Sequence, residues 1–134
     1  MEVTTHQQGQ RDVPHFERKL RAKWQEVRIR AREVLLRAGN ERYVQIAGQV
    51  HDVEDESLAD LLVDVNLAEA SRDIQEIRDI EDALRRIALG TYGTCVRCKR
   101  PIEGRRLEAF PTASRCTQCQ REYEKGHPAP PPSL

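Results

Sequence analysis

Four cysteines near the end of the chain place the strongest constraint on its fold. Cys95, Cys98, Cys116 and Cys119 follow the pattern C-x2-C-x17-C-x2-C. Each C-x-x-C pair lets two thiolates approach one ion from a single turn, and two such pairs complete a tetrahedral shell with no position left for water. The pattern therefore predicts a structural zinc site with these four residues as ligands.

Disulfide bonds and a redox pair are the alternatives to a metal site. Disulfide bonds need an oxidising compartment, but Met1 is followed by Glu2 and a polar stretch over 4–11, without the apolar segment of a secretory signal. A thioredoxin-like redox pair remains the second alternative to zinc. No apolar run approaches the roughly 18 residues of a transmembrane helix, so we expect a cytoplasmic protein that does not enter membranes.

Composition and charge favour long paired helices over a thick globular core. Charged residues make up 33% of the chain and aromatic residues only 4%, and a paired helix needs only a narrow apolar stripe. The net charge is zero, yet residues 1–50 carry +4, residues 51–90 carry −8 and residues 91–125 carry +4. A basic arm can therefore face an acidic one, although exposed pairs contribute only about 0–1 kcal/mol each.

Apolar residues repeat at coiled-coil spacing in two stretches. We expect a frayed N-terminus over 1–12 and a coiled-coil hairpin over 13–90, with helices of about 35 residues and 50 Å each. Gly39-Asn40 predicts a kink or a short break, and Gly90 suits a left-handed cap at the end of the second helix. The first stripe is Phe16, Leu20, Trp24, Val27, Ala31, Val34, Ala38, Tyr43, Ile46 and Val50, and the second is Val63, Leu67, Ala70, Ile74, Ile77, Leu84 and Ile87.

The stretch 51–57 predicts the turn of the hairpin and is rich in acids. It holds Asp52, Glu54, Asp55 and Glu56, and Asp55 or Ser57 would cap the following helix. Judged from charge alone, these acids are better explained as a polar loop than as a site that binds a metal ion or another protein. No histidine stands beside a plausible nucleophile, so we expect no catalytic site and no enzyme.

Residues 91–125 form the predicted four-cysteine zinc-finger module, with helical turns over 120–125 and a disordered Pro-rich tail over 126–134. Basic side chains surround the cysteines. They could hold the phosphates of a nucleic acid, or they could balance the charge of a zinc tetrathiolate. The second role is favoured because no cluster of base-stacking aromatic residues accompanies them. These side chains are Arg97, Lys99, Arg100, Arg105, Arg106 and Arg115.

A longer motif surrounds the cysteines. It comprises Tyr92-Gly93-Thr94-Cys95-Val96-Arg97-Cys98, Ile102, Arg105-Arg106-Leu107-Glu108-Ala109, Pro111-Thr112-Ala113 and Cys116-Thr117-Gln118-Cys119. This motif closely resembles the zinc-finger signature of the DksA/TraR family over about residues 91–122, and the likeness extends more weakly back to about residue 14. It implies a hairpin that enters the secondary channel of bacterial RNA polymerase, with an acidic tip near the active site and no binding of promoter DNA.

Members of that family carry a tip motif D-x-x-D-x-A. Here Asp52 and Asp55 match both acids, while Ser57 replaces the alanine. The resemblance implies that Asp52 and Asp55 act toward the polymerase active centre. The serine hydroxyl needs a hydrogen-bond partner if it is buried. The tip motif could therefore act on the polymerase more weakly, or differently, than in other members of the family.

The resemblance also concerns the alarmone ppGpp, which the family binds partly between factor and polymerase through basic side chains. Asp79, Phe110 and Gln120 occupy those positions in this chain. A carboxylate at Asp79 would repel a polyphosphate. We therefore expect weak or absent synergy with ppGpp.

These features predict a mainly α protein: a long antiparallel coiled-coil helical hairpin, a small four-cysteine zinc-finger module and a short C-terminal helix. Its predicted function is regulation of transcription initiation through direct binding of RNA polymerase, without sequence-specific DNA binding. The alternative is a zinc-finger module that binds nucleic acid or another protein through its basic residues. A short turn favours a monomer, although a coiled-coil stripe can also pair with itself or with another chain.

Overall fold

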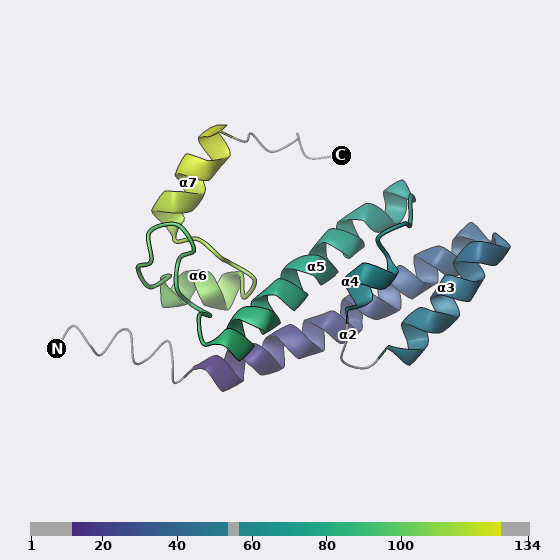
Figure 1. Ribbon diagram of the computed structural model, residues 1–134, viewed down its shortest axis with the longest axis horizontal. Helices are drawn as coiled ribbons and strands as arrows, with labels where there is room; N and C mark the ends of the chain where they lie inside the picture. The colour runs from purple at the N-terminus through teal and green to yellow at the C-terminus, as the bar shows by residue number, and fades with distance from the viewer. Residues whose placement is uncertain (1–11, 54–56, 127–134) are drawn as a thin grey trace.

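Helices account for most of this fold. The computed structural model describes residues 12–53 and 57–126, so the predicted frayed N-terminus and Pro-rich tail lie almost entirely outside the described residues. Two long helices form a hairpin, a shorter pair packs against it, and a further pair belongs to the C-terminal module (Figure 1). In chain order they are α2 (Val13–Ala38), α3 (Glu41–Asp52), α4 (Leu58–Leu61), α5 (Ala68–Leu89), α6 (Gly104–Ala109) and α7 (Thr117–Gly126).

The long helices α2 and α5 run antiparallel. At one end Phe16 of α2 lies beside Tyr92, just beyond α5, with ring centroids 5.8 Å apart. Toward the other end Arg30 of α2 places its Nη2 atom 3.3 Å from Asp73 and 3.0 Å from Glu76 of α5. The basic arm thus faces the acidic arm, and the predicted mainly α hairpin is confirmed.

Local sequence explains where the long helices begin and end. Pro14 stands in the first turn of α2, where its missing N–H removes no helical hydrogen bond. Gly39 ends α2 with φ 74° and Gly90 ends α5 with φ 77°, a left-handed conformation that glycine adopts without strain from a Cβ atom. Ala38, also part of the predicted stripe, is exposed, and Leu35, which is not part of it, is buried. The rest of the predicted stripe of α2 is buried through Phe16, Leu20, Trp24, Val27, Ala31 and Val34.

The chain reverses at Gly39-Asn40. The sequence predicts only a kink or a short break there, within a first helix that continues to about residue 50. Instead, the Asn40 side chain accepts a hydrogen bond from the Tyr43 N–H at 2.8 Å and caps a new helix, α3. This helix folds back along α2 and buries Ala47 and Val50. The predicted break is present, but the prediction that the first arm continues past it to about residue 50 is wrong, because a glycine stop is followed directly by an asparagine cap.

The second long helix begins later than the sequence predicts. The sequence places its start just after Asp55 or Ser57, but α5 begins at Ala68, after the short helix α4. Ser57 precedes α4 without a side-chain capping bond, and Asp55 lies outside the described residues. Leu58 and Leu62 are buried, at 0% and 1% exposed, so apolar packing holds this stretch against the hairpin.

The described ends of the acidic segment (residues 51–57), Asp52 and Ser57, do not lie at the far end of the hairpin. That end consists of the last turn of α2, the turn into α3 and the first turn of α5 (Figure 1). Because α3 runs back, Arg28 in the middle of α2 donates from Nη1 to the Val53 carbonyl at 2.5 Å. At 1.5 Å per residue, this contact lies about 15 Å short of the end of α2. The long helices also have 26 and 22 residues rather than about 35.

One continuous apolar core joins the hairpin to the C-terminal module. Tyr92, Ile102 and Leu107 of the module belong to the same buried cluster as Leu20 and Trp24 of α2. The described residues contribute no buried polar or charged side chain to it. Across the same two ranges, no helix has both the length and the apolarity that a membrane span requires.

Candidate metal centre and acidic segment

The four predicted metal ligands converge at one point. Cys95 and Cys98 lie in the turn that follows α5, Cys116 precedes α7, and Cys119 lies in the first turn of α7. Their sulfur atoms all lie within 4.8 Å of one another. None of the four forms a disulfide bond, and Cys98 is the most exposed of them. The fold thus unites both C-x-x-C pairs in one cluster.

Backbone hydrogen bonds shape the first of the two cysteine turns. The Cys95 N–H donates to the Arg100 carbonyl at 2.8 Å, and the Lys99 N–H donates to the Cys95 carbonyl at 3.0 Å. Lys99 has φ 64°, which is uncommon for a residue with a side chain. The Cys98 N–H points at the sulfur of Cys95 from 3.5 Å. The turn therefore offers an N–H group to a thiolate before any ion is bound.

The spacing of the sulfur atoms suits a tetrahedral ion. Zinc–sulfur bonds of about 2.3 Å place neighbouring sulfurs of a tetrahedron about 3.8 Å apart. The Cys98 and Cys116 sulfurs are 3.8 Å apart. The cluster therefore fits a tetrahedral metal ion with four thiolate ligands.

The thiols of this cluster differ strongly in acidity. Burial opposes ionisation of Cys95, but N–H groups of Cys98, Cys116 and Arg97 outweigh it and lower the pKa of the Cys95 thiol to about 6. Burial, together with the neighbouring thiols, raises the pKa of Cys119 to about 12. The Cys95 thiol therefore ionises readily, whereas the Cys119 thiol resists ionisation. A divalent cation bound by these residues would supply the charge that allows all four to be thiolates.

Glu103 is a supporting residue that the sequence did not reveal. Its carboxylate accepts hydrogen bonds from the Thr117 N–H at 3.3 Å and from the Thr117 hydroxyl at 3.1 Å. Burial opposes ionisation, but these donors and the backbone N–H of Glu103 itself lower the pKa of the carboxyl. The contact fixes the start of α7 between Cys116 and Cys119. No short-range pattern links positions so far apart, so sequence reasoning had no signal for it.

Several basic side chains around the cysteines take part in the structure of the module. Arg97 forms an ion pair with Glu122 of α7. Arg106 donates from Nε to the Arg115 carbonyl at 2.9 Å, and the Arg115 guanidinium lies 4.0 Å from the centre of the Tyr123 ring. These contacts favour a structural role for the three arginines over phosphate binding.

The acidic segment is described only at its ends. Asp52 is the last residue of α3, with its side chain 83% exposed, and one carboxylate oxygen lies 3.2 Å from Nδ1 of His51. Ser57 precedes α4 and is partly buried. Asp55 lies outside the described residues.

Side chains of the hairpin anchor both described ends of this segment. Besides the bond from Arg28 to the Val53 carbonyl, Glu81 of α5 accepts from the Leu58 N–H at 2.9 Å and from Nε1 of Trp24 at 3.0 Å. The sequence singles out neither Arg28 nor Glu81, because each acts through a contact between distant parts of the chain.

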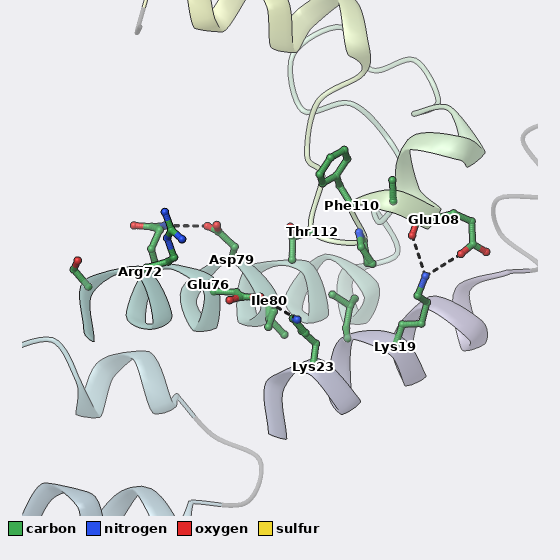
Figure 2. A pocket seen from close by; sticks show the side chains of 14 residues that line it. Lys19, Lys23, Arg72, Glu76, Asp79, Ile80, Glu108, Phe110 and Thr112 are labelled. Atoms are coloured by element: carbon green, nitrogen blue, oxygen red, sulfur yellow. Dashed lines mark hydrogen bonds and ion pairs between the residues drawn. The ribbon is translucent and has the colours of Figure 1, made fainter. Parts of the chain in front are cut away.

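A groove of about 760 Å³ lies between α2, α5 and the chain after α6. Figure 2 shows Asp79 and Phe110 among the side chains that line it. The structure therefore brings together two of the three positions that the family resemblance connects with ppGpp. Gln120 lies elsewhere, on α7, where its Nε2 donates to Glu124 at 3.1 Å.

Known proteins share both parts of this architecture. Residues 90–125 match a family model described as the prokaryotic dksA/traR C4-type zinc finger. Over 117 residues, 86% of this chain aligns at 31% identity with 78% of a protein from Caulobacter vibrioides (strain NA1000 / CB15N), named RNA polymerase-binding transcription factor DksA. The chain belongs to the DksA/TraR family.

Solved structures of DksA/TraR proteins are also similar to this chain. The solution structure of the DnaK suppressor protein from Agrobacterium tumefaciens C58 has 32% identity and a TM-score of 0.54, covering 82% of this chain and 92% of that one. The structure of transcription factor DksA2 from Pseudomonas aeruginosa has 25% identity and a TM-score of 0.44, with 85% and 90% covered. The family match over residues 90–125 spans all four cysteines of the cluster.

Proposed function

We propose that this chain binds bacterial RNA polymerase directly and regulates transcription initiation. The observation that carries the proposal is its 31% identity with a protein named RNA polymerase-binding transcription factor DksA, over 78% of that protein. An alignment of 117 residues extends well beyond the finger and includes most of the helical part. Binding of the same partner, RNA polymerase, would account for the similarity to this relative over both the helices and the zinc finger.

The ion in the metal centre is proposed to be zinc, in a structural role. Four converging cysteine ligands suit Zn²⁺, which imposes no geometry of its own. Such a shell leaves no open coordination position for water or substrate, so we propose no catalytic role for the site. The ion would hold the Cys95 turn against α7 and thereby fix the module on the hairpin.

In the proposed mechanism the hairpin enters the secondary channel of the polymerase. Asp52 and Asp55 would then act on basic groups and magnesium near the active centre, where charge complementarity governs the contact. Ser57 in place of alanine would weaken or alter this action. The contact would shift the stability of initiation complexes, so that it lowers the output of one promoter and raises that of another. We propose that the protein acts as a monomer in the cytoplasm.

Weak dependence on ppGpp belongs to the same proposal. Asp79 lines the groove beside Phe110 and accepts a hydrogen bond from Nε2 of Gln75 at 3.0 Å. Its carboxylate would repel a polyphosphate, and Lys19, which also lines the groove, is already paired with Glu108. Purified transcription reactions with and without ppGpp test this point. A large gain with ppGpp would contradict it.

The first experiment is a binding competition. Zinc-loaded protein is mixed with purified bacterial RNA polymerase and an established secondary-channel factor. Mutually exclusive binding is the expected result and would support entry of the hairpin into the channel. Simultaneous binding, or no binding at all, would contradict the proposal.

A double variant then tests the acidic segment. Asp52→Asn with Asp55→Asn should leave folding and polymerase affinity unchanged while abolishing the transcriptional effect. Glu33→Gln, which removes an exposed carboxylate from α2, is the matched control and should regulate like the parent. A double variant that also regulates like the parent would exclude the proposed role of these two aspartates.

The alternative function is nucleic-acid or protein binding through the finger. Arg100 and Arg105 are exposed on the module, which is the observation that favours it. Binding to DNA or RNA that weakens steeply with added salt would identify phosphate contacts, and the competition above would then show no effect of the second factor.

A further inference from the structure

We propose that the groove beside α5 is a contact site for a second copy of this chain. The two copies would place their α5 helices side by side in opposite directions, related by a two-fold axis near Gln75. Each copy would then present the same surface to the other, as in most symmetric dimers. The inference concerns the free protein and goes beyond the proposed function, in which a single copy binds the polymerase.

Most of the charged side chains that line the groove neutralise one another. Lys19 pairs with Glu108 at 2.9 Å, and Nζ of Lys23 lies 3.8 Å from a carboxylate oxygen of Glu76. Glu76 also pairs with Arg30 of α2 at 3.0 Å. Six charged residues line the groove, so one cation and one anion remain, and both belong to α5.

The remaining cation is Arg72 and the remaining anion is Asp79. Both are exposed, and within residues 12–53 and 57–126 neither forms an ion pair. Asp79 accepts a hydrogen bond from the amide of Gln75 at 3.0 Å. The charge of Arg86 also acts on Asp79, but its Nη2 donates to the Thr112 carbonyl at 3.2 Å. The two remaining charges are therefore available to groups from outside the chain.

The order of these charges makes the surface complementary to itself. Arg72 and Asp79 are seven residues apart, so they lie on one face of α5, separated by about 10.5 Å along its axis. Gln75 lies between them. An antiparallel second α5 that meets the first at this residue would bring Arg72 opposite the second copy's Asp79, and the reverse. A parallel second helix in the same register would oppose like charges.

Phe110 would supply the apolar part of the contact. This residue lines the groove and is 59% exposed, although the Arg106 guanidinium lies 5.7 Å from its ring centre. Figure 2 shows the ring toward the Asp79 end of the groove, whereas Arg72 lies toward the other end. The two-fold axis would bring the second copy's ring to the Arg72 end, where it could stack on the guanidinium. Both rings would thereby lose contact with water.

The pair would be weak and would depend on concentration. Stable interfaces bury about 800 Å² on each partner, and one helix face with one aromatic ring provides less. Ion pairs at a surface contribute little and are screened by salt. Single copies would therefore predominate in dilute protein, and pairs would form as the concentration rises.

Sedimentation equilibrium of the full-length, zinc-loaded protein tests the pairing. At low salt we expect the mass to rise from one copy toward two between about 10 µM and about 1 mM, the range of a weak contact, and to fall again on addition of salt. Arg72→Glu and Asp79→Lys should each prevent pairing, because like charges would meet across the axis. Their matched controls are Arg78→Glu and Glu33→Lys, which make the same charge changes at exposed positions outside the groove. Both controls should pair like the parent.

A mixture of the two groove variants separates this arrangement from a general effect of charge. Each variant repels itself, but a mixed pair of Arg72→Glu with Asp79→Lys restores both contacts between opposite charges. The mixture should therefore pair with an affinity within about threefold of the parent, and so should the double variant that carries both changes. Circular dichroism confirms that every variant is folded.

Phe110→Ser tests the apolar part of the contact. We expect it to raise the dissociation constant of the pair by about tenfold, because aromatic anchors dominate many contacts. A parent that remains a single copy at every concentration would overturn the inference. Groove variants that pair like the parent, a mixture that recovers no pairing, or an unchanged dissociation constant in Phe110→Ser would overturn it too. None of these outcomes depends on RNA polymerase, so the proposed function stands or fails separately.

Discussion

Lys19 of α2 donates two hydrogen bonds from Nζ to Glu108 of α6, one to the carboxylate and one to the backbone carbonyl, both at 2.9 Å (Figure 2). His15 places its Nε2 atom 2.9 Å from the other carboxylate oxygen. This contact connects the metal-binding module to the base of the hairpin. The contact therefore helps to set the angle between the hairpin and the module, which in the proposed function bind the same polymerase.

Removing the charge of Glu108 should weaken this connection in a pH-dependent way. The hydrogen bond from Lys19 lowers the pKa of Glu108, with a smaller contribution from His15 against a small opposing effect of burial. A carboxyl with a lowered pKa stabilises the fold above its unfolded pKa and loses that contribution as pH falls through its folded pKa. We expect Glu108→Gln to destabilise the protein at pH about 7 and to match the parent once pH is well below about 4.

Thermal unfolding of both proteins over this pH range checks the expectation. Glu33→Gln, at an exposed position of α2, serves as control and should show no such trend. If the melting temperatures of Glu108→Gln and the parent differ by the same amount down to the lowest pH, the charge of Glu108 is not what holds the module.

Tyr92 should contribute through its hydroxyl as well as its ring. The ring packs beside Phe16, and the hydroxyl donates to the Pro111 carbonyl at 2.7 Å. Tyr92→Phe keeps the ring but removes this bond, so we expect a loss of about 1 kcal/mol in the free energy of unfolding at neutral pH. Urea denaturation measures this loss. Tyr43→Phe, on α3, is a control away from the contact.

Alkaline pH should abolish the difference between Tyr92→Phe and the parent. Burial raises the pKa of Tyr92 to about 12, although the Arg86 charge opposes the shift. A raised pKa means that the neutral hydroxyl stabilises the fold below its unfolded pKa of about 10, and that this contribution is lost as pH rises toward 12. If the advantage of the parent over Tyr92→Phe in the free energy of unfolding instead grows between pH 10 and 12, the hydroxyl is not the source of the effect.

Glu81 should be more important for stability than its exposed neighbours. It accepts from Nε1 of Trp24 and from the backbone N–H groups of Leu58 and Ala59. Because bonds to a charged acceptor contribute roughly 1.5–3 kcal/mol, we expect Glu81→Ala to lower the free energy of unfolding by about 2 kcal/mol. Trp24 is the single tryptophan of the chain, so its fluorescence reports the change directly.

Asp82→Ala is the matched control for Glu81→Ala. Asp82 forms an exposed pair with Arg85 at 2.9 Å on the same helix, and such pairs contribute only about 0–1 kcal/mol. Equal losses in the two variants, with unchanged tryptophan emission in both, would disprove the bridging role of Glu81.

Sequence reasoning succeeded where the signal was local. The clustering of the four cysteines followed from two C-x-x-C pairs, because the geometry of each pair is set within one turn. The two long helices followed from apolar spacing, which reflects one helix face. At Gly39-Asn40 the sequence predicts only a kink or short break, because the apolar repeat continues beyond it. The direction that the chain takes after such a break depends on tertiary contacts, such as those of Arg28 and Glu81, that have no local pattern.

Loss of the metal should release the C-terminal module and spare most of the hairpin. Metal binding contributes on the order of 10 kcal/mol to small modules of this kind. We expect Cys116→Ser, or treatment with a chelator, to remove zinc and to reduce helical circular dichroism by roughly the share of α6 and α7. The Lys19 contact should be lost as well, because Glu108 lies in α6.

A double comparison makes this last prediction specific. In zinc-loaded protein Glu108→Gln should lower the melting temperature at neutral pH, whereas in the Cys116→Ser background the same change should have no further effect. Non-additivity of this kind identifies residues that act through one structural unit. Ser114→Ala, beside the cluster but not a ligand, is the control and should retain the metal. Stoichiometric zinc in Cys116→Ser with unchanged melting would refute a structural site, because the fold would then not depend on a complete thiolate shell.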